Sequence, residues 1–184
     1  MARPLTIRPA AITDSDAIAA IYAHYVETTA ISFETERPDG GIMASRIRDC
    51  LPRYPYLAAE SEGKLTGYAY ATRLYERAAY RWTAEATIYV AHDRCGMGIG
   101  RELYAALIDS LRNQGFQSVV GKITLPNSAS VRLHERIGFV QSGILHKVGY
   151  KLGSWHDVGL YQLDLAARPE APDETLPFSL DQSR

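Results

Sequence analysis

A glycine-rich run places three glycines at alternate positions, Gly96-Met97-Gly98-Ile99-Gly100, directly before a helical pattern. Glycines let the backbone turn sharply and approach a ligand closely, and the amides at a helix N-terminus attract anions. The run therefore predicts a loop that holds a phosphate group of a nucleotide-type cofactor, with an ordinary turn as the alternative. It fits neither a Walker loop, because Arg101 and Glu102 follow Gly100, nor a dinucleotide fingerprint, because the third small residue is missing.

A stripe of polar side chains is expected on a later helix, where Asn127, Ser130 and His134 stand three and then four residues apart. Residues at this spacing share one helix face. An imidazole exchanges protons near neutral pH, which makes His134 a candidate acid or base. The alternative is a histidine that is merely packed against apolar neighbours.

An isolated carboxylate, Glu85, lies in the alternating segment 81–90. Alternation in a strand puts Trp82, Ala84, Ala86, Ile88 and Val90 on one face and Thr83, Glu85, Thr87 and Tyr89 on the other. Glu85 could take a proton from an ammonium group, directly or through water. The alternative is an ion pair with Arg77 or Arg81.

The pattern Asn127-x-x-Ser130-x-x-Leu133-His134-x-x-x-Gly138-Phe139, one strand after the glycine-rich helix start, resembles the GNAT acetyltransferase superfamily. The resemblance implies that acetyl-CoA is the co-substrate and that Gly98 and Gly100 belong to its pyrophosphate loop. Cys95 stands where that loop usually has Gln or Arg, and His134 stands where the helix usually has Tyr.

A closer resemblance links the chain, from about Ile7 to Leu165, to the phosphinothricin and methionine sulfoximine acetyltransferases. It rests on the run 82–90, the triplet 133–135, the run Gly153-Ser154-Trp155-His156-Asp157-Val158-Gly159, and Phe33, Arg77 and Tyr80. It implies direct acetyl transfer to the α-amino group of a small amino acid. Other amine acceptors (a polyamine, an antibiotic, a protein N-terminus) and a non-catalytic acyl-CoA-binding domain remain alternatives.

This resemblance also implies roles for individual residues. Glu85 would be the general base, His134 would share that duty or protonate the thiolate, and the Val90 N–H would bind the oxyanion. The expected cofactor site is Ile88, Tyr89, Val90, Cys95, Gly96, Met97, Gly98, Ile99, Gly100, Arg101, Asn127 and Ser130. The expected acceptor site is Phe33, Arg77, Tyr80, Thr87, Tyr89, Lys151, Trp155 and Val158.

Composition narrows the classes of partner. A net charge of −1 over 184 residues, with both signs interspersed, argues against nucleic acid, and no apolar run is long enough to span a membrane. Two distant cysteines, Cys50 and Cys95, and no apolar N-terminal run favour the cytoplasm and give no metal motif. Cys95 lacks a base at recognisable spacing, so no covalent role is expected. The resemblance implies a homodimer, with 150–155 as candidate interface.

These residues need a scaffold, and the resemblance implies a GNAT fold: an α/β (α+β) domain with one mixed, largely antiparallel sheet of about seven strands and four helices. Periodicity predicts strands over 5–8, 56–60, 65–71, 81–90, 118–124, 139–148 and 157–165, with a loop over 149–155. Helices are predicted from 13–16 onward, from 42 to near 52, from 99 to 115 and from 126 to 138. Residues 1–166 form the expected domain, and 167–184 a Pro-rich extension.

Overall fold

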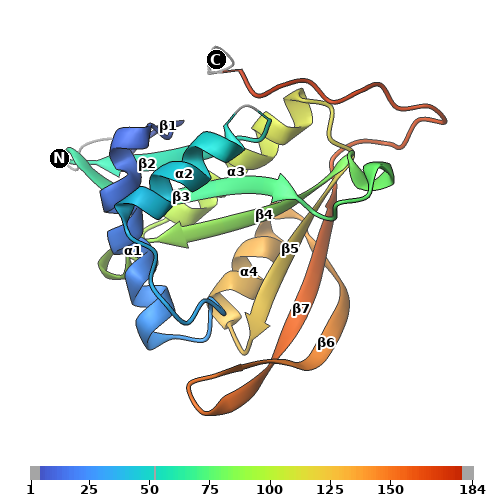
Figure 1. The fold of residues 1–184 in the computed structure, drawn as a ribbon. Helices are drawn as coiled ribbons and strands as arrows, with labels where there is room; N and C mark the ends of the chain where they lie inside the picture. The colour runs from blue at the N-terminus through green and yellow to red at the C-terminus, as the bar shows by residue number, and fades with distance from the viewer. Residues whose placement is uncertain (1–4, 52, 180–184) are drawn as a thin grey trace.

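The computed structural model describes residues 5–51 and 53–179. Over these residues one seven-stranded sheet has the order β1-β2-β3-β4-β5-β7-β6 (Figure 1). The strands are β1 (Thr6–Pro9), β2 (Tyr56–Ser61), β3 (Lys64–Arg73), β4 (Thr83–Val90), β5 (Ser118–Leu125), β6 (Val140–Lys151) and β7 (Ser154–Asp164). Every neighbouring pair is antiparallel except β4 and β5, which run parallel.

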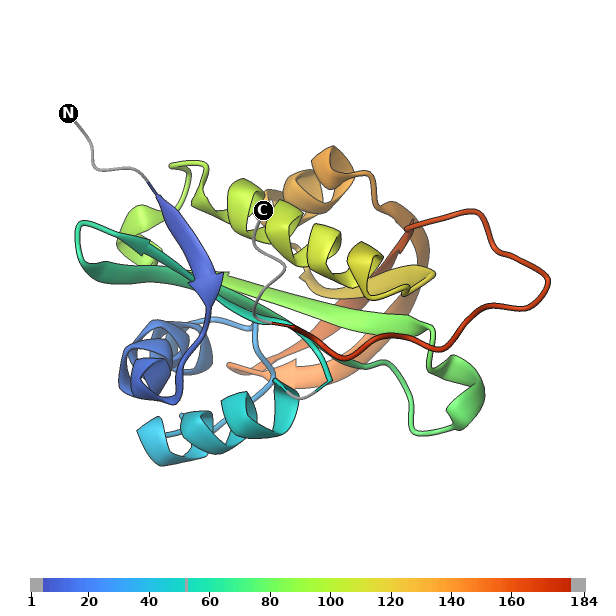
Figure 2. The same ribbon diagram turned by 90° about the horizontal axis from the view of Figure 1, so that it is seen from above.

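Four α-helices cover the two faces of the sheet within the described ranges. Helices α1 (Ser15–Thr28) and α2 (Gly40–Cys50) lie on one face, and α3 (Ile99–Asn113) and α4 (Ser128–Ile137) on the other (Figures 1 and 2). Short 3-10 turns occupy Ile12–Asp14, Ala78–Tyr80 and His92–Arg94. The predicted fold class, a mixed sheet of seven strands with four helices, is confirmed.

Strand alternation sorts side chains by size between the two faces. Ala69, Ala71 and Ala84 are fully buried, as are Leu103 and Leu107 of the helix that covers them. Small alanines let α3 lie close to the sheet. The opposite face of the same strands carries tyrosines, which pack towards α1 and α2. The α1–α2 face of the sheet is therefore lined with phenol groups.

The parallel ladder between β4 and β5 is short. Its register contains three pairs, from Thr83 with Ser118 to Glu85 with Val120. Beyond them β4 stays paired to β3 and β5 to β7, so the two strands diverge, as Figure 1 shows. The sheet thus opens directly after Glu85.

The last two strands form one long hairpin, which corrects the expectation of a loop over 149–155. Gly149 pairs with His156 and Tyr150 with Trp155, and only Leu152 and Gly153 form the turn. Both turn residues have positive φ, 50° and 77°, as a two-residue hairpin turn requires. Aromatic and glycine residues that suggested a loop are accommodated here in an exposed, twisted ribbon.

The chain after β7 lies back against the domain (Figure 2). The Trp82 indole N–H donates to the Asp173 carbonyl at 2.7 Å, and Arg81 pairs with Glu174 at 2.8 Å. The fully buried Gln114 side chain donates to the Leu176 carbonyl at 2.8 Å, and the Leu176 N–H donates to the Gln114 carbonyl. The described part of the extension is thereby fastened to the C-terminal end of α3.

Candidate active site

A small cleft of about 50 Å³ lies where β4 and β5 diverge. This β4–β5 cleft is lined by Ile31, Ala86, Thr87, Ile88, Tyr89, Lys122, Ile123, Thr124, Asn127, Ser130 and His134. Six of these residues were predicted as site residues: Thr87, Ile88, Tyr89, Asn127, Ser130 and His134. The divergence of the strands and the helix stripe therefore bring together residues that are distant in the sequence.

The backbone of β4 faces this cleft beyond Glu85. The Ala91 N–H donates to Thr66 of the β3 side at 2.8 Å, so by strand alternation the Val90 N–H points to the opposite edge, where β5 has turned away. The Tyr25 hydroxyl donates to the Val90 carbonyl at 2.5 Å and anchors that peptide to α1. The amide predicted to bind the oxyanion thus lies at the cleft edge.

The glycine-rich loop leads into α3 beside the same cleft. Gly96 and Gly98 have φ of 80° and 86°, a conformation that glycine adopts without strain, and Gly98 is the N-cap of α3. No side chain caps the first amides of this helix. A Cβ at Gly100 would touch Leu133 of α4 and Val90 at 3.5 Å. The uncapped N-terminus of α3 therefore lies between the end of β4 and α4.

His134 is buried, with only 4% of its surface exposed, and both ring nitrogens have partners. Nδ1–H donates to the Ser130 carbonyl at 2.8 Å, and Nε2 accepts from the Tyr104 hydroxyl at 3.0 Å. A Cβ at Gly121 would lie 2.6 Å from Nε2, so this glycine lets the ring approach β5. Burial lowers the pKa of His134 below its usual 6.5, against a smaller opposing effect of the Ser130 bond. The imidazole is neutral at pH 7.

Glu85 pairs with a residue that the sequence did not suggest. Its carboxylate accepts a hydrogen bond from Lys122 Nζ at 2.6 Å, and neither side chain is fully exposed. The suggested partner Arg81 pairs with Glu174 instead. Lys122 also lines the β4–β5 cleft, so the ion pair lies at the point where the strands separate. The parallel register of β4 and β5 brings the two groups together.

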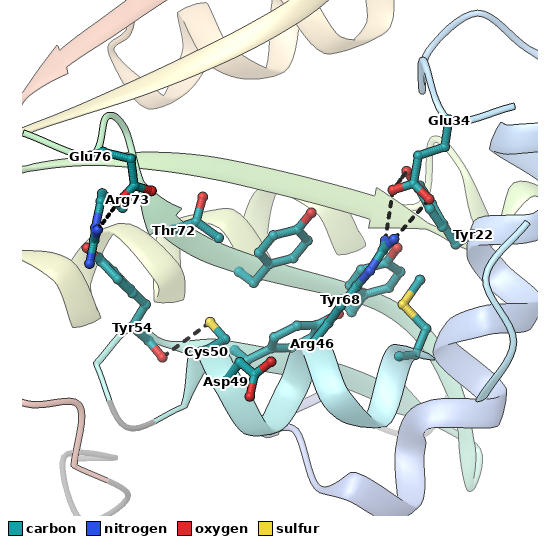
Figure 3. Close-up of a pocket in the computed structure, with 13 residues that line it drawn as sticks. Tyr22, Glu34, Arg46, Asp49, Cys50, Tyr54, Tyr68, Thr72, Arg73 and Glu76 are labelled. Atoms are coloured by element: carbon teal, nitrogen blue, oxygen red, sulfur yellow. Dashed lines mark hydrogen bonds and ion pairs between the residues drawn. The ribbon is translucent and has the colours of Figure 1, made fainter. Parts of the chain in front are cut away.

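A larger cavity of about 590 Å³ lies between α2 and the tyrosine-bearing face of the sheet (Figure 3). This tyrosine cavity is lined by Tyr22, Glu34, Met43, Arg46, Asp49, Cys50, Tyr54, Tyr56, Tyr68, Tyr70, Thr72, Arg73 and Glu76. Figure 3 shows Arg46 bound to Glu34 at one end and Arg73 beside Glu76 at the other. Five tyrosines contribute to its lining.

The tyrosine cavity reaches the neighbourhood of Glu85. Thr72, which lines the cavity, is the β3 residue directly opposite Glu85, and Tyr70 is opposite Thr87. Directly opposed residues of antiparallel strands project to the same face, about 5 Å apart. A molecule whose amine lies at Glu85 can therefore extend into the tyrosine cavity.

Six predicted acceptor residues lie outside the linings of both cavities: Phe33, Arg77, Tyr80, Lys151, Trp155 and Val158. Arg77 and Tyr80 are exposed at the 3-10 turn before β4, and Trp155 is 62% exposed on the β6–β7 hairpin. The Phe33 ring lies against Gly149 of the same hairpin. Val158 is buried in β7.

Lys151 is buried, and its Nζ donates to the Ser32 carbonyl at 2.7 Å. Burial lowers the pKa of this amine. The same loop continues into Glu34, which receives a bidentate hydrogen bond from Arg46 at 2.8 and 3.0 Å. Lys151 thus joins the β6–β7 hairpin to the α1–α2 loop.

Cys95 is exposed, just before the glycines. Its thiol lies 3.7 Å from the Ala91 carbonyl and 3.8 Å from the Tyr25 hydroxyl. Neither group is a base that would activate a thiol, so the surroundings supply no reason for a covalent role. Met97 of the same loop is also exposed.

Residues 7–160 match the family model described as acetyltransferase (GNAT) domain. The chain belongs to the GNAT acetyltransferase family. The phosphinothricin N-acetyltransferase of Streptomyces viridochromogenes is 46% identical over 88% of this chain and 88% of that protein. The L-methionine sulfoximine/L-methionine sulfone acetyltransferase of Pseudomonas aeruginosa is 37% identical over 91% and 98%.

A solved GNAT structure, the phosphinothricin acetyltransferase of Sinorhizobium meliloti in complex with AcCoA, is 31% identical to this chain. It superposes with a TM-score of 0.86 and covers 91% of this chain and 95% of its own. The resemblance derived from the helix stripe and the glycine loop is confirmed at the level of the family and of these relatives.

Two further features concern the described part of this GNAT chain. Within residues 5–51 and 53–179, no three His, Cys, Asp or Glu side chains gather so that they could hold a metal ion. None of the helices in these ranges has the length and apolar character needed to cross a bilayer.

Proposed function

We propose that the protein is an acetyl-CoA-dependent N-acetyltransferase that acetylates the α-amino group of phosphinothricin, methionine sulfoximine or a similar small L-amino acid. The observation that carries the proposal is the β4–β5 cleft, which is lined by the α4 stripe and by Lys122, the ion-pair partner of Glu85. Relatives named as phosphinothricin and methionine sulfoximine acetyltransferases support this acceptor class.

Acetyl-CoA is assigned to the side of the cleft formed by α3 and α4. The uncapped amides at the α3 N-terminus and the loop 95–101 would receive the pyrophosphate, because such amides attract anions. Asn127 caps α4 by accepting from the Ser130 N–H at 3.1 Å, so the polar stripe beside the cleft is held in place. Ile88, Tyr89 and Val90 would flank the thioester.

The reaction is a direct transfer. The neutral amine attacks the thioester carbonyl, a C–N bond forms, and the C–S bond breaks as the thiolate leaves. Glu85 accepts the amine proton, directly or through water, and the Val90 N–H stabilises the oxyanion. Lys122 holds the Glu85 carboxylate in position.

His134 is assigned to returning a proton to the departing thiolate. Its lowered pKa keeps it neutral, so Nε2 can take up the proton that Glu85 removed from the amine, delivered through water, and pass it to the thiolate. Its Nε2 partner, the Tyr104 hydroxyl, remains protonated because burial raises its pKa. His134 lines the cleft, and the fully buried Tyr104 holds its ring in position.

The remaining assignments concern the acceptor and the assembly. We assign Thr87 and Tyr89, which line the β4–β5 cleft, to the acceptor site, and only the resemblance assigns Phe33, Arg77, Tyr80, Lys151, Trp155 and Val158 to it. We assign the exposed apolar side chains of the β6–β7 hairpin to a homodimer interface: Val140, Ile144, Leu145, Val148, Tyr150, Leu152 and Trp155. Light scattering should give twice the chain mass, and a monomer would contradict this assignment.

We also propose a cytoplasmic location for the protein. A host that expresses it should resist phosphinothricin, because acetylation removes the charge of the amine of that compound. We also assign residues 1–166 to the catalytic domain and 167–184 to an extension of it.

The proposal is tested by an acceptor panel. Purified protein and acetyl-CoA are incubated with phosphinothricin, methionine sulfoximine, the standard amino acids, a polyamine and an aminoglycoside, and products are identified by mass spectrometry. The proposal requires α-N-acetylated phosphinothricin or methionine sulfoximine among the preferred products. A product formed only from the polyamine or the aminoglycoside would show that the acceptor assignment is wrong.

A further inference from the structure

Two buried phenol hydroxyls in the tyrosine cavity have no hydrogen-bond partner among the described residues. Tyr56 and Tyr68 are 2% and 1% exposed, and no hydrogen bond is formed by either hydroxyl. Burial raises both pKa values, so both groups remain O–H donors. Among the described residues, the side-chain N and O atoms that are both fully enclosed and without a hydrogen-bond partner are Arg81 Nε, Gln114 Oε1 and Gln117 Oε1. The hydroxyls of Tyr56 and Tyr68 also lack partners but do not belong to this set, so they are not fully enclosed. Both therefore reach the cavity.

The arrangement of the rings makes these hydroxyls a continuous surface. The rings of Tyr56, Tyr68 and Tyr70 are nearly parallel, with interplanar angles of 6° to 14°. Side chains stand roughly perpendicular to a sheet, so the hydroxyl ends face α2 across the cavity. Met43 and Arg46 of α2 line the opposite wall. A ligand between these walls would pack against the tyrosine rings, and its tip would lie close to the unpartnered hydroxyls of Tyr56 and Tyr68.

The charges of the cavity favour a neutral ligand tip. Glu34 is neutralised by Arg46, and Glu76 by Arg73, so the two ends of the cavity are already paired. Asp49 is exposed to solvent at the edge. A charged tip would lose its hydration without gaining a free counter-charge at the hydroxyls, which is costly. A neutral group that donates and accepts hydrogen bonds suits them.

The distance between Glu85 and Tyr56 favours an acceptor amino acid with a long side chain. Tyr70 lies two residues from Thr72 along β3, and Tyr56 lies opposite Tyr70 on the next strand. With about 3.3 Å per residue and 4.8 Å between strands, Tyr56 is roughly 12 Å from Glu85. A short side chain ends over Tyr70, whereas a hydroxyphenyl group approaches the hydroxyls of Tyr56 and Tyr68.

We propose that the tyrosine cavity is a side-chain subsite that extends the acceptor range to aromatic L-amino acids with a hydrogen-bonding ring substituent, of the L-tyrosine class. The inference rests on the proposed function, because the amine must lie at Glu85. The ligand hydroxyl replaces water between the hydroxyls of Tyr56 and Tyr68, and its ring packs on the tyrosine walls. The transfer step is unchanged: the amine gains the acetyl group and the thiolate gains the proton.

The test compares kcat/KM for L-tyrosine, L-phenylalanine and methionine sulfoximine in the wild type, Tyr56→Phe and Tyr68→Phe. These variants remove one hydroxyl each and keep the packed ring. Tyr75→Phe, which removes an exposed hydroxyl from the segment between β3 and β4, is the matched control. Calorimetric binding of L-tyrosine to the same four proteins gives a readout that does not need turnover.

We expect the wild type to acetylate L-tyrosine better than L-phenylalanine. Loss of one hydrogen bond should lower kcat/KM and affinity for L-tyrosine about three- to tenfold in Tyr56→Phe or Tyr68→Phe, and leave L-phenylalanine and methionine sulfoximine within twofold. The control should match the wild type for all three.

Acetylation of methionine sulfoximine without binding or turnover of L-tyrosine would overturn the subsite and leave the proposed function intact. Equal losses for all three acceptors would also overturn it, because they would indicate a structural role. Hydroxyl-dependent L-tyrosine binding without transfer to any acceptor would support the cavity as a binding site and contradict the proposed function.

Discussion

The side chains at the β4–β5 cleft are fixed by partners. Lys122 holds the Glu85 carboxylate, the Ser130 carbonyl and the Tyr104 hydroxyl hold the two nitrogens of His134, and Tyr25 holds the Val90 carbonyl. Such contacts place a reacting group within a narrow range of positions, which direct transfer between two bound substrates requires. The predictions for single residues therefore replace one functional group at a time.

Replacing Glu85 by Gln keeps an oxygen that can accept from Lys122 but removes the carboxylate that we propose takes the amine proton. We expect kcat/KM for methionine sulfoximine to fall about 100-fold or more, the usual contribution of a general base. Steady-state thiol release between pH 7 and 9 measures it. Glu27→Gln, an exposed carboxamide substitution on α1, should behave like the wild type. An unchanged rate for Glu85→Gln would remove this residue from the mechanism.

The buried imidazole of His134 makes stability depend on pH. Its folded pKa lies below 6.5, so stability is complete above pH 6.5 and falls as the pH drops below it, because the unfolded chain takes up the proton first. Thermal unfolding at pH 7.5 and 5.5 should show a larger loss in the wild type than in His134→Gln. Equal losses would contradict the neutral, buried imidazole.

Sequence patterns identified Glu85 and His134 but not all of their partners. Lys122 faces Glu85 only because β4 and β5 run parallel in one register, which strand periodicity does not determine. Tyr104 meets His134 because Gly121 leaves room between α3, α4 and β5. These contacts join elements far apart in the chain, and local spacing carries no information about them.

Among the elements, the turn into α3 has a backbone conformation that glycine adopts without strain and alanine does not. Gly98 and Gly63 both have positive φ, at 86° and 72°, and neither would meet another atom with a Cβ. One starts α3 beside the cleft, and the other lies in the β2–β3 hairpin. They form a matched pair for separating strain from ligand binding.

Gly98→Ala and Gly63→Ala should each cost about 1 kcal/mol of stability, because both force alanine into the left-handed region. Only Gly98→Ala should raise KM for acetyl-CoA, about tenfold, since its loop is assigned to the pyrophosphate. Thermal unfolding and KM are measured for both variants. A similar KM for acetyl-CoA in the two variants would contradict the assignment of the loop.

Element types were largely predictable because the core has clear periodicity, as in α3, where Leu103, Leu107 and Leu111 are fully buried. Both strands of the β6–β7 hairpin were predicted, but their continuation over 149–151 and 154–156 was not, because apolar, aromatic and glycine residues follow one another there without alternation. The opening between β4 and β5 could not be predicted from the local sequence pattern either, because it arises from the pairing of β4 with β3 and of β5 with β7.

At the scale of the whole molecule, the tyrosine cavity and the β4–β5 cleft lie on neighbouring parts of one sheet, because Tyr70 of the cavity is directly opposite Thr87 of the cleft. The C-terminal segment is fastened away from the cleft, at Trp82 and Gln114. Stability and activity should therefore be separable by changes at these two places.

A chain ending at Ala166 loses the hydrogen bonds of Asp173 and Leu176. We expect a loss of about 3 kcal/mol, at about 1 kcal/mol for each of the three net hydrogen bonds, and a fall in Tm of about 6–12 °C. The kcat/KM for methionine sulfoximine should stay within twofold at 25 °C. Glu174→Gln, which removes only an exposed ion pair, should leave Tm nearly unchanged. An unaltered Tm after truncation would show that the segment adds no stability.

The central claim is direct acetyl transfer to a small amino acid at the β4–β5 cleft. Its most direct test is the initial rate of CoA thiol release while acetyl-CoA and methionine sulfoximine are both varied. The account predicts saturation by both substrates, intersecting lines in double-reciprocal plots, and one α-N-acetyl product per thiol. Parallel lines would contradict direct transfer, and no thiol release with methionine sulfoximine or phosphinothricin would contradict the proposed function itself.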